Sequence, residues 1–133
     1  MNCLCFTDRW GAFEQFYEGE KAWEKLDLTK AKEKYKSALV QDRIKDHSSP
    51  FDLAYLNTTF GEFLMMEPIN RPDLAEARLK LALNYNPNYA LAHYDLWQLY
   101  LKTGDEEKSI NHQNKFKALW QQADEEVKGI YGF

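Results

Sequence analysis

Apolar residues recur at intervals of three and four through most of the chain, the spacing that places them on one face of an α-helix. Residues 31 to 39 illustrate the pattern, because Ala31, Tyr35 and Ala38 fall on one side of a helix whose other side is polar. Six such stretches follow one another with short interruptions. They predict an all-α fold in which six helices pack as three hairpins.

The interruptions carry residues that begin and end helices. Ser49-Pro50-Phe51-Asp52 has the form of a capping box with proline in the first turn. Thr103-Gly104-Asp105 offers a glycine to end one helix and an aspartate to begin the next. Further breaks are predicted at Asp27-Leu28-Thr29, between Pro68 and Pro72, and at Asn86-Pro87-Asn88.

The outer ends of the first and last helices have weaker boundary signals. Thr7 or Asp8 is the expected cap of the first helix, which should run to about Lys25. The last helix begins near Glu106, and no strong breaker follows before Gly129. We therefore expect that helix to be unusually long, or to bend where something packs on it.

Small and large residues repeat at matched positions along the chain. Ala75 and Ser109 lie 34 residues apart, as do Ala82 and Phe116. This period over helix-turn-helix units resembles the tetratricopeptide repeat family. The positions that fit the family pattern are Gly19, Asp27, Ala31, Tyr35 and Ala38 in the first unit, Gly61, Leu64, Ala75, Leu79, Ala82 and Pro87 in the second, and Leu96 and Tyr100 in the third. Small residues at these places let facing helices approach closely.

The resemblance implies a right-handed α-α superhelix, a TPR-like solenoid of three helix-turn-helix units with an extended C-terminal helix. On this interpretation residues 1–133 form a single domain. Its units lie at about 12–45, 50–87 and 88–120, and a C-terminal extension or cap lies at about 120–133. Arrays of this family bind other proteins on a concave groove formed by the first helix of each unit, so the resemblance implies protein binding.

Carried over to this chain, that groove is rich in aromatic residues and methionine and has an acidic edge. Such a surface suits an amphipathic or basic segment of a partner protein. For the aromatic members, a place in the core of this small protein is the alternative. The residues expected in the groove are Phe13, Phe16, Glu20, Trp23, Tyr55, Glu62, Met65, Leu91, Tyr94, Gln98 and Leu101.

A second apolar stripe lies near the C-terminus. Phe116, Trp120, Ala123 and Val127 follow at intervals of four, three and four on an otherwise polar helix. The outer face of a terminal repeat needs a cover, so this stripe is predicted to cap the end of the array. A dimer interface, or a helix that binds a partner, is the alternative.

Net charge, hydrophobicity and cysteine content bear on which partners and which cellular location to expect. A net charge of −4 disfavours a nucleic-acid partner. No window approaches the roughly 20 apolar residues of a membrane span, and no secretory signal is recognisable, so we expect a cytoplasmic protein without membrane insertion. The two cysteines, Cys3 and Cys5, are expected to be free thiols, and the three histidines are too dispersed to indicate a metal site.

Motifs that support catalysis are missing from the sequence. It has no glycine-rich phosphate loop, no His-Glu-x-x-His and no Gly-x-Ser-x-Gly, so we predict no enzymatic activity and no cofactor. The leading hypothesis is a non-catalytic protein–protein interaction module, an adaptor or assembly chaperone that holds a partner segment in its groove. The alternative is a structural module that forms a homodimer through the groove or the C-terminal helix.

Overall fold

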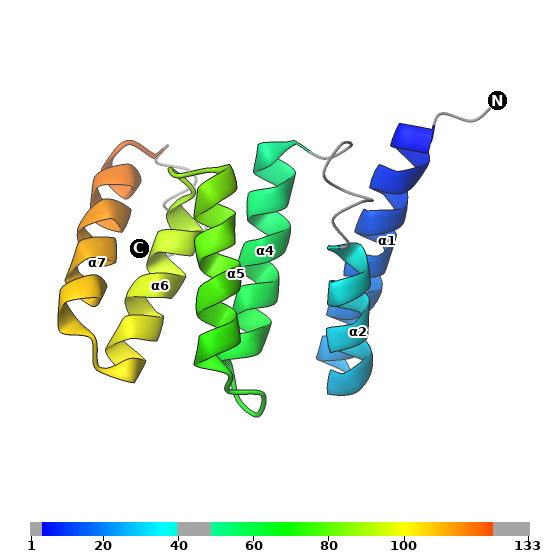
Figure 1. Ribbon diagram of the computed structural model, residues 1–133, viewed down its shortest axis with the longest axis horizontal. Coiled ribbons are helices and arrows are strands. Elements are labelled where there is room, and N and C mark those ends of the chain that lie inside the picture. The colour runs from blue at the N-terminus through cyan, green and yellow to red at the C-terminus, as the bar shows by residue number, and fades with distance from the viewer. Residues whose placement is uncertain (1–3, 40–48, 124–133) are drawn as a thin grey trace.

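The computed structural model describes the backbone of residues 4–39 and 49–123, and the side chains of these segments from residue 13 onward. This part of the chain contains six α-helices and no strand, which confirms the all-α prediction (Figure 1). The helices are α1 (Leu4–Glu24), α2 (Leu28–Ala38), α4 (Pro50–Met65), α5 (Pro72–Tyr85), α6 (Ala90–Thr103) and α7 (Glu106–Gln121).

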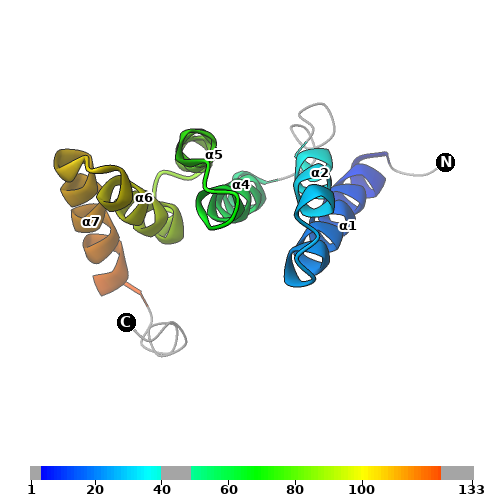
Figure 2. The ribbon, with the colours of Figure 1, turned by 90° about the horizontal axis from the view of Figure 1, so that it is seen from below.

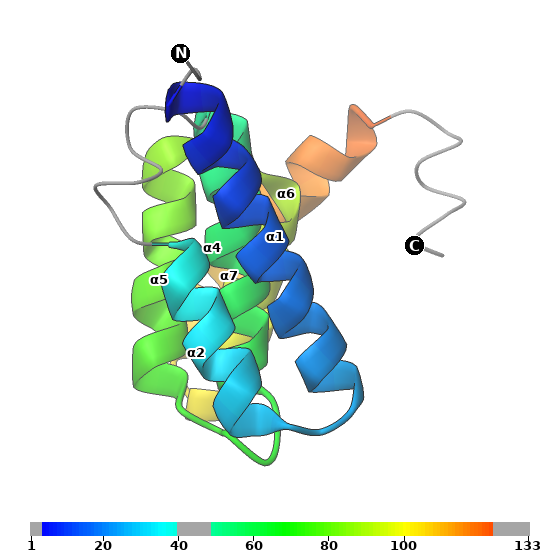
Figure 3. The same ribbon diagram turned by 90° about the vertical axis from the view of Figure 1, so that its right-hand side faces the viewer.

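Consecutive helices pack against each other as three hairpins, formed by α1 with α2, α4 with α5, and α6 with α7. The hairpins follow one another in chain order along the long axis of the molecule, and this order is visible in two perpendicular views (Figures 1 and 2). Seen along that axis, the first hairpin stands in front of the others (Figure 3). The described part of the protein is therefore a row of hairpins.

Local capping explains where several helices begin and end. The side chain of Ser49 accepts a hydrogen bond from the backbone N–H of Asp52, and the Asp52 carboxylate accepts one from the N–H of Ser49, which confirms the predicted capping box. Gly104 ends α6 with a φ of 88°, in the left-handed region that favours glycine. The next residue, Asp105, accepts from the N–H of Lys108 and so caps α7.

Two predicted helix boundaries are wrong. Helix α1 begins at Leu4, before Thr7 and Asp8, because residues 4–8 contain no glycine or proline that would interrupt helical hydrogen bonds. The expectation of an unusually long last helix is also wrong, because α7 ends at Gln121; the alternative, a bend further on, falls outside the described residues. The last described turn of α7 closes with hydrogen bonds from Gln122 and Ala123 to carbonyls three residues back, the tighter pattern that is frequent where an α-helix ends.

Small residues let the two helices of a hairpin approach closely, as the repeat pattern predicts. A Cβ atom added to Gly19 of α1 would lie 3.0 Å from the ring of Tyr35 of α2. One added to Gly61 of α4 would lie 2.9 Å from the side chain of Leu79 of α5. Ala31, Ala75 and Ser109 are buried at the corresponding positions of the second helices.

Different side chains join successive hairpins. Between the first and second hairpins the contacts are aromatic: the ring of Tyr35 lies 5.6 Å from that of Phe60 and 5.3 Å from that of Phe63, and Trp23 meets Phe63 edge-on at 5.2 Å between ring centroids. Between the second and third hairpins lies a cluster of fully buried alanines, Ala54, Ala82 and Ala92.

Candidate protein-binding cleft

A cleft of about 620 Å³ lies between α1 and α4, the first helices of the first two hairpins. It contains four residues of the predicted groove, namely Phe13, Phe16, Glu20 and Tyr55. Two residues that the sequence reasoning did not select, Glu14 and Tyr17, complete its lining. Among the described residues no lysine or arginine lines the cleft, and the charged side chains that do line it, Glu14 and Glu20, are acidic.

The spacing of residues on α1 builds one wall of this cleft. Phe13, Phe16, Tyr17 and Glu20 are three or four residues apart and so share one face of the helix. Phe16 is the anchor, because it is buried and its ring lies 5.3 Å from that of Tyr35 on α2. Tyr17 remains 57% exposed, and the ammonium of Lys21 lies over its ring, 4.7 Å from the centroid.

Helix α4 supplies the opposite wall through Tyr55. Its ring lies 5.6 Å from that of Phe16, so an aromatic contact forms the floor where the two hairpins meet. Tyr55 is 38% exposed, which leaves part of the ring accessible to a ligand in the cleft. The cleft therefore combines a rigid aromatic floor with exposed aromatic edges.

Carboxylates continue along α1 beyond the aromatic floor. Glu20, Trp23 and Glu24 line a further hollow of about 330 Å³ that shares Glu20 with the cleft. Partial burial raises the pKa of Glu20, and the neighbouring Glu24 carboxylate raises it further. A cation placed here would relieve that repulsion.

Trp23, another predicted groove residue, belongs partly to the core. Its ring meets Tyr35 at 6.4 Å and Phe63 at 5.2 Å, both edge-on. Half-buried Met65 also packs against the same core. The alternative that some groove aromatics are core residues therefore applies to Trp23 and to buried Phe16.

An acidic pair joins α4 to α6. Asp95 is buried, and its Oδ2 atom has no hydrogen-bond partner. Burial, together with a hydrogen bond to Glu62 and the charge of that residue, raises the pKa of Asp95 to about 10. At neutral pH the Asp95–Glu62 pair therefore holds a proton. Glu62 is one of the predicted groove residues, and the structure places it in this pair.

The predicted groove residues of the third hairpin do not line the cleft. Tyr94 packs its ring on Trp97 and Phe116, at 5.5 and 5.3 Å. Leu91 and Gln98 are half-buried, and Leu101 is 56% exposed. The structure brings together the groove residues of α1 and Tyr55 of α4, and it places those of α6 elsewhere.

Of the predicted apolar stripe near the C-terminus, only Phe116 and Trp120 lie on a described helix, α7. Phe116 is buried against Tyr94 and Trp97 of α6, and Trp120 stacks on Phe116 at 5.7 Å. Ala123 follows the end of α7, so it cannot continue a helical stripe. Val127 and Cys3 lie outside the described residues, as does the side chain of Cys5.

The geometry defines a class of protein: an all-α row of helical hairpins with an apolar, acid-edged cleft at one joint. No group of three potential metal ligands occurs within residues 4–39 and 49–123. None of the helices in these segments is both long enough and apolar enough to cross a membrane. Comparisons with protein-family models, with curated proteins and with solved structures each find no match.

Proposed function

We propose that the protein is a non-catalytic protein–protein interaction module that binds an amphipathic, basic segment of a partner in the cleft between α1 and α4. In this proposal the hairpins form a TPR-like right-handed superhelix, and the protein acts in the cytoplasm as an adaptor or assembly chaperone. The observation that carries the proposal is the cleft itself, whose described lining offers exposed aromatic rings beside carboxylates and includes no lysine or arginine. Lys21 lies at its margin, where its ammonium is 4.7 Å from the centroid of the Tyr17 ring and pairs with Glu18 at 3.4 Å.

The apolar part of the cleft supplies the affinity. Burying one leucine or phenylalanine side chain of a partner contributes about 1.5–3 kcal/mol. The exposed ring of Tyr17 and the partly exposed ring of Tyr55 provide the surface against which such a side chain packs. A helix that presents apolar residues at intervals of three and four would place more than one of them along α1.

The carboxylates at the cleft determine its specificity for a partner. Glu14, Glu20 and Glu24 lie on α1 beside the aromatic residues. Each solvent-exposed ion pair with a lysine or arginine of the ligand adds only about 0.2–1 kcal/mol, but an acidic ligand is repelled. The cleft therefore favours a segment that is apolar on one side and basic at its flanks.

Fluorescence anisotropy with two designed helical peptides tests this proposal. One peptide consists of leucine and lysine, and the other has glutamate in place of every lysine. We expect the lysine peptide to bind, and the combined substitutions Tyr17→Ala and Glu20→Gln to weaken it about tenfold, which is about 1.4 kcal/mol. The glutamate peptide should bind more weakly than the lysine peptide.

A matched control removes an exposed apolar side chain and an exposed carboxylate on α7, away from the cleft. Ile110→Ala with Glu107→Gln does this, because Ile110 is 54% exposed and Glu107 lies exposed in the first turn of α7. The control variant should bind like the wild type. Equal loss in both variants, or equal binding of both peptides, would contradict the proposal.

Sedimentation over a range of protein concentrations addresses the homodimer alternative. A monomer that binds the lysine peptide supports the interaction module. A dimer that dissociates when Tyr17 and Glu20 are changed would show that a second copy of the chain occupies the cleft, and the partner-binding proposal would fail.

A further inference from the structure

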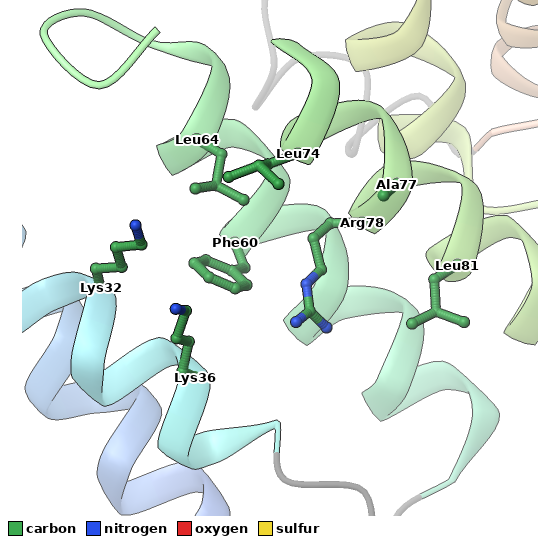
Figure 4. A pocket seen from close by; sticks show the side chains of 8 residues that line it. All are labelled: Lys32, Lys36, Phe60, Leu64, Leu74, Ala77, Arg78 and Leu81. Carbon is green, nitrogen blue, oxygen red and sulfur yellow. The ribbon is translucent and has the colours of Figure 1, made fainter. Parts of the chain in front are cut away.

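A second cavity, of about 300 Å³, lies at the same joint on the side of α2 and α5 (Figure 4). Lys32 and Lys36 extend into it from α2, and Arg78 extends from α5. Phe60 of α4 lies between these groups, with aliphatic side chains of α4 and α5 around it. The cavity therefore has an aromatic floor and three cations, and none of the described residues that line it is a carboxylate.

These three cations have no ion pair within the described part of the chain. Other basic residues do: Lys80 reaches Glu76 at 3.3 Å, and Arg71 reaches Asp73 at 3.0 Å. Lys32 and Lys36 are four residues apart on one helix, a spacing at which like charges destabilise the helix. Within the described residues their charges are thus brought together without an ion pair.

Arg78 is the most constrained of the three. Its guanidinium lies over the Phe60 ring at 5.0 Å, and one of its nitrogens donates to Oδ1 of Asn57 at 3.3 Å. A guanidinium has five N–H donors, so this bond to a neutral amide leaves most of them available. Burial lowers the pKa of Arg78, as expected for a cation without a carboxylate partner.

We propose that this basic pocket, defined by Lys32, Lys36, Phe60 and Arg78, binds an acidic segment of a partner protein in which a carboxylate side chain stands next to an aromatic or large aliphatic one. The carboxylate would accept hydrogen bonds from the guanidinium of Arg78 and the ammonium of Lys36. The apolar neighbour would pack in the space around Phe60. This site is separate from the acid-edged cleft and takes a ligand of opposite charge.

The charge and the volume of the basic pocket indicate which ligand it binds. Three cations distributed over two hairpins suit several carboxylates along a chain better than one small anion. A volume of about 300 Å³ is at the lower end of small-molecule pockets, and it accommodates a pair of side chains. A second copy of this chain and a free amphiphilic carboxylate are the competing occupants.

NMR titration of the protein with a short capped peptide of glycine and serine that carries Glu-Phe-Glu at its centre tests the proposal. A peptide with Gln-Phe-Gln is the ligand control. We expect the first peptide to shift the amide signals around Lys36 and Arg78, and the second to bind at least about fivefold more weakly, because each lost ion pair contributes up to about 1 kcal/mol. Equal binding of the two peptides would overturn the proposal.

Variants that remove the same amount of charge distinguish the effect of the pocket from the effect of the protein's net charge. Lys32→Gln with Lys36→Gln should weaken the Glu-Phe-Glu peptide at least about fivefold, whereas Lys115→Gln with Lys117→Gln, on exposed positions of α7, should not. Circular dichroism checks that each variant keeps its helices. Equal loss in both variants would show a general charge effect and would overturn the proposal.

The competing occupants give different results in the same system. Octanoate that displaces the peptide with equal or better affinity would identify a small-molecule site and overturn the proposal. A dimer that dissociates in the Lys32 and Lys36 variant would assign the pocket to a second copy and also overturn it. None of these outcomes depends on the cleft between α1 and α4, so the two proposals can fail separately.

Discussion

The two joints between hairpins are made from side chains of very different size. At the first joint, rings of Tyr35, Phe60 and Phe63 fill the space between hairpins. At the second, the packed residues include alanines, and the backbones of α4 and α5 both come close to that of α6. Neither α1 nor α2 approaches α4 or α5 as closely.

The difference in size has a consequence for binding. Large rings hold the first two hairpins apart, and the acid-edged cleft and the basic pocket lie on the two sides of that joint. Small residues bring the second and third hairpins together and leave less space between them. In a row of hairpins, the size of the side chains at a joint therefore helps to decide where a cleft opens.

The largest expected effect is loss of a ring from the first joint. Phe63→Ala should lower the free energy of unfolding by about 3–5 kcal/mol, because it empties the space that Trp23 and Tyr35 share with this residue. Denaturation in urea measures it. Phe51→Ala, at a position that is 62% exposed, is the control and should cost far less. Equal losses would mean that the aromatic joint does not hold the hairpins together.

The second joint should be destabilised by the opposite kind of substitution, one that puts a larger side chain between the second and third hairpins. Ala92→Leu places a larger side chain in the fully buried alanine cluster and should cost about 1–3 kcal/mol of unfolding free energy. Ala118→Leu, at an exposed position of α7, should change stability little. A neutral or stabilising effect of Ala92→Leu would show that this joint has spare room and would weaken the contrast between the joints.

Substitution in the acidic pair at the second joint, Asp95 with Glu62, should have a smaller effect on the free energy of unfolding, and this effect should depend on pH. The folded pKa of Asp95 is raised, to about 10, so stability falls as pH rises above the ordinary carboxyl pKa. Asp95→Asn keeps the shape, donates to Glu62 and removes this penalty, so it should stabilise by about 1–2 kcal/mol at pH 7. The gain should shrink toward pH 4. Thermal unfolding across that range measures the difference from wild type, and a gain that persists at pH 4 would contradict the assignment.

The smallest effect concerns the third hairpin, where His93 and His112 meet. Their Nδ1 atoms are 3.0 Å apart, and the Nε2 atom of His93 lies 2.7 Å from the carbonyl oxygen of Pro87. Burial, together with the charges of His93 and Lys115, lowers the pKa of His112 to about 4. The unfolded chain therefore takes up protons first, and stability should fall from about pH 6.5 toward pH 4.

The wild type should lose stability between pH 6.5 and pH 4, and His112→Phe should make that loss smaller by about 1 kcal/mol over the same pH range. Hydrogen exchange should locate the acid-sensitive opening in α6 and α7, because no histidine lies in the described part of the first two hairpins. An acid response of equal size in the variant would assign the effect to other groups.

Local signals explain how much of the fold the sequence could predict. The capping box at Ser49, the cap at Asp105 and the left-handed Gly104 depend on neighbours in the chain, and each was predicted correctly. The small residues at Gly19 and Gly61 also mark helix contacts correctly. These features need no knowledge of how the hairpins are placed.

The candidate sites depend on that placement and were only partly predicted. Tyr17 could have been found, because it is four residues from Phe13 and three from Glu20 on one helical face. The basic pocket could not, since it forms only when Lys36 of α2 and Arg78 of α5 are brought to the same side of Phe60. The end of α7 at Gln121 was missed because no breaker residue marks it.

The central claim is that the aromatic joint opens an acid-edged cleft in which a basic amphipathic segment binds. Mapping the leucine and lysine peptide onto the protein by NMR tests it most directly. We predict that the largest amide shifts fall on α1 and α4, around Tyr17, Glu20 and Tyr55, and that α6 and α7 change little. Shifts centred on α6 and α7, or no saturable shifts at all, would contradict the claim.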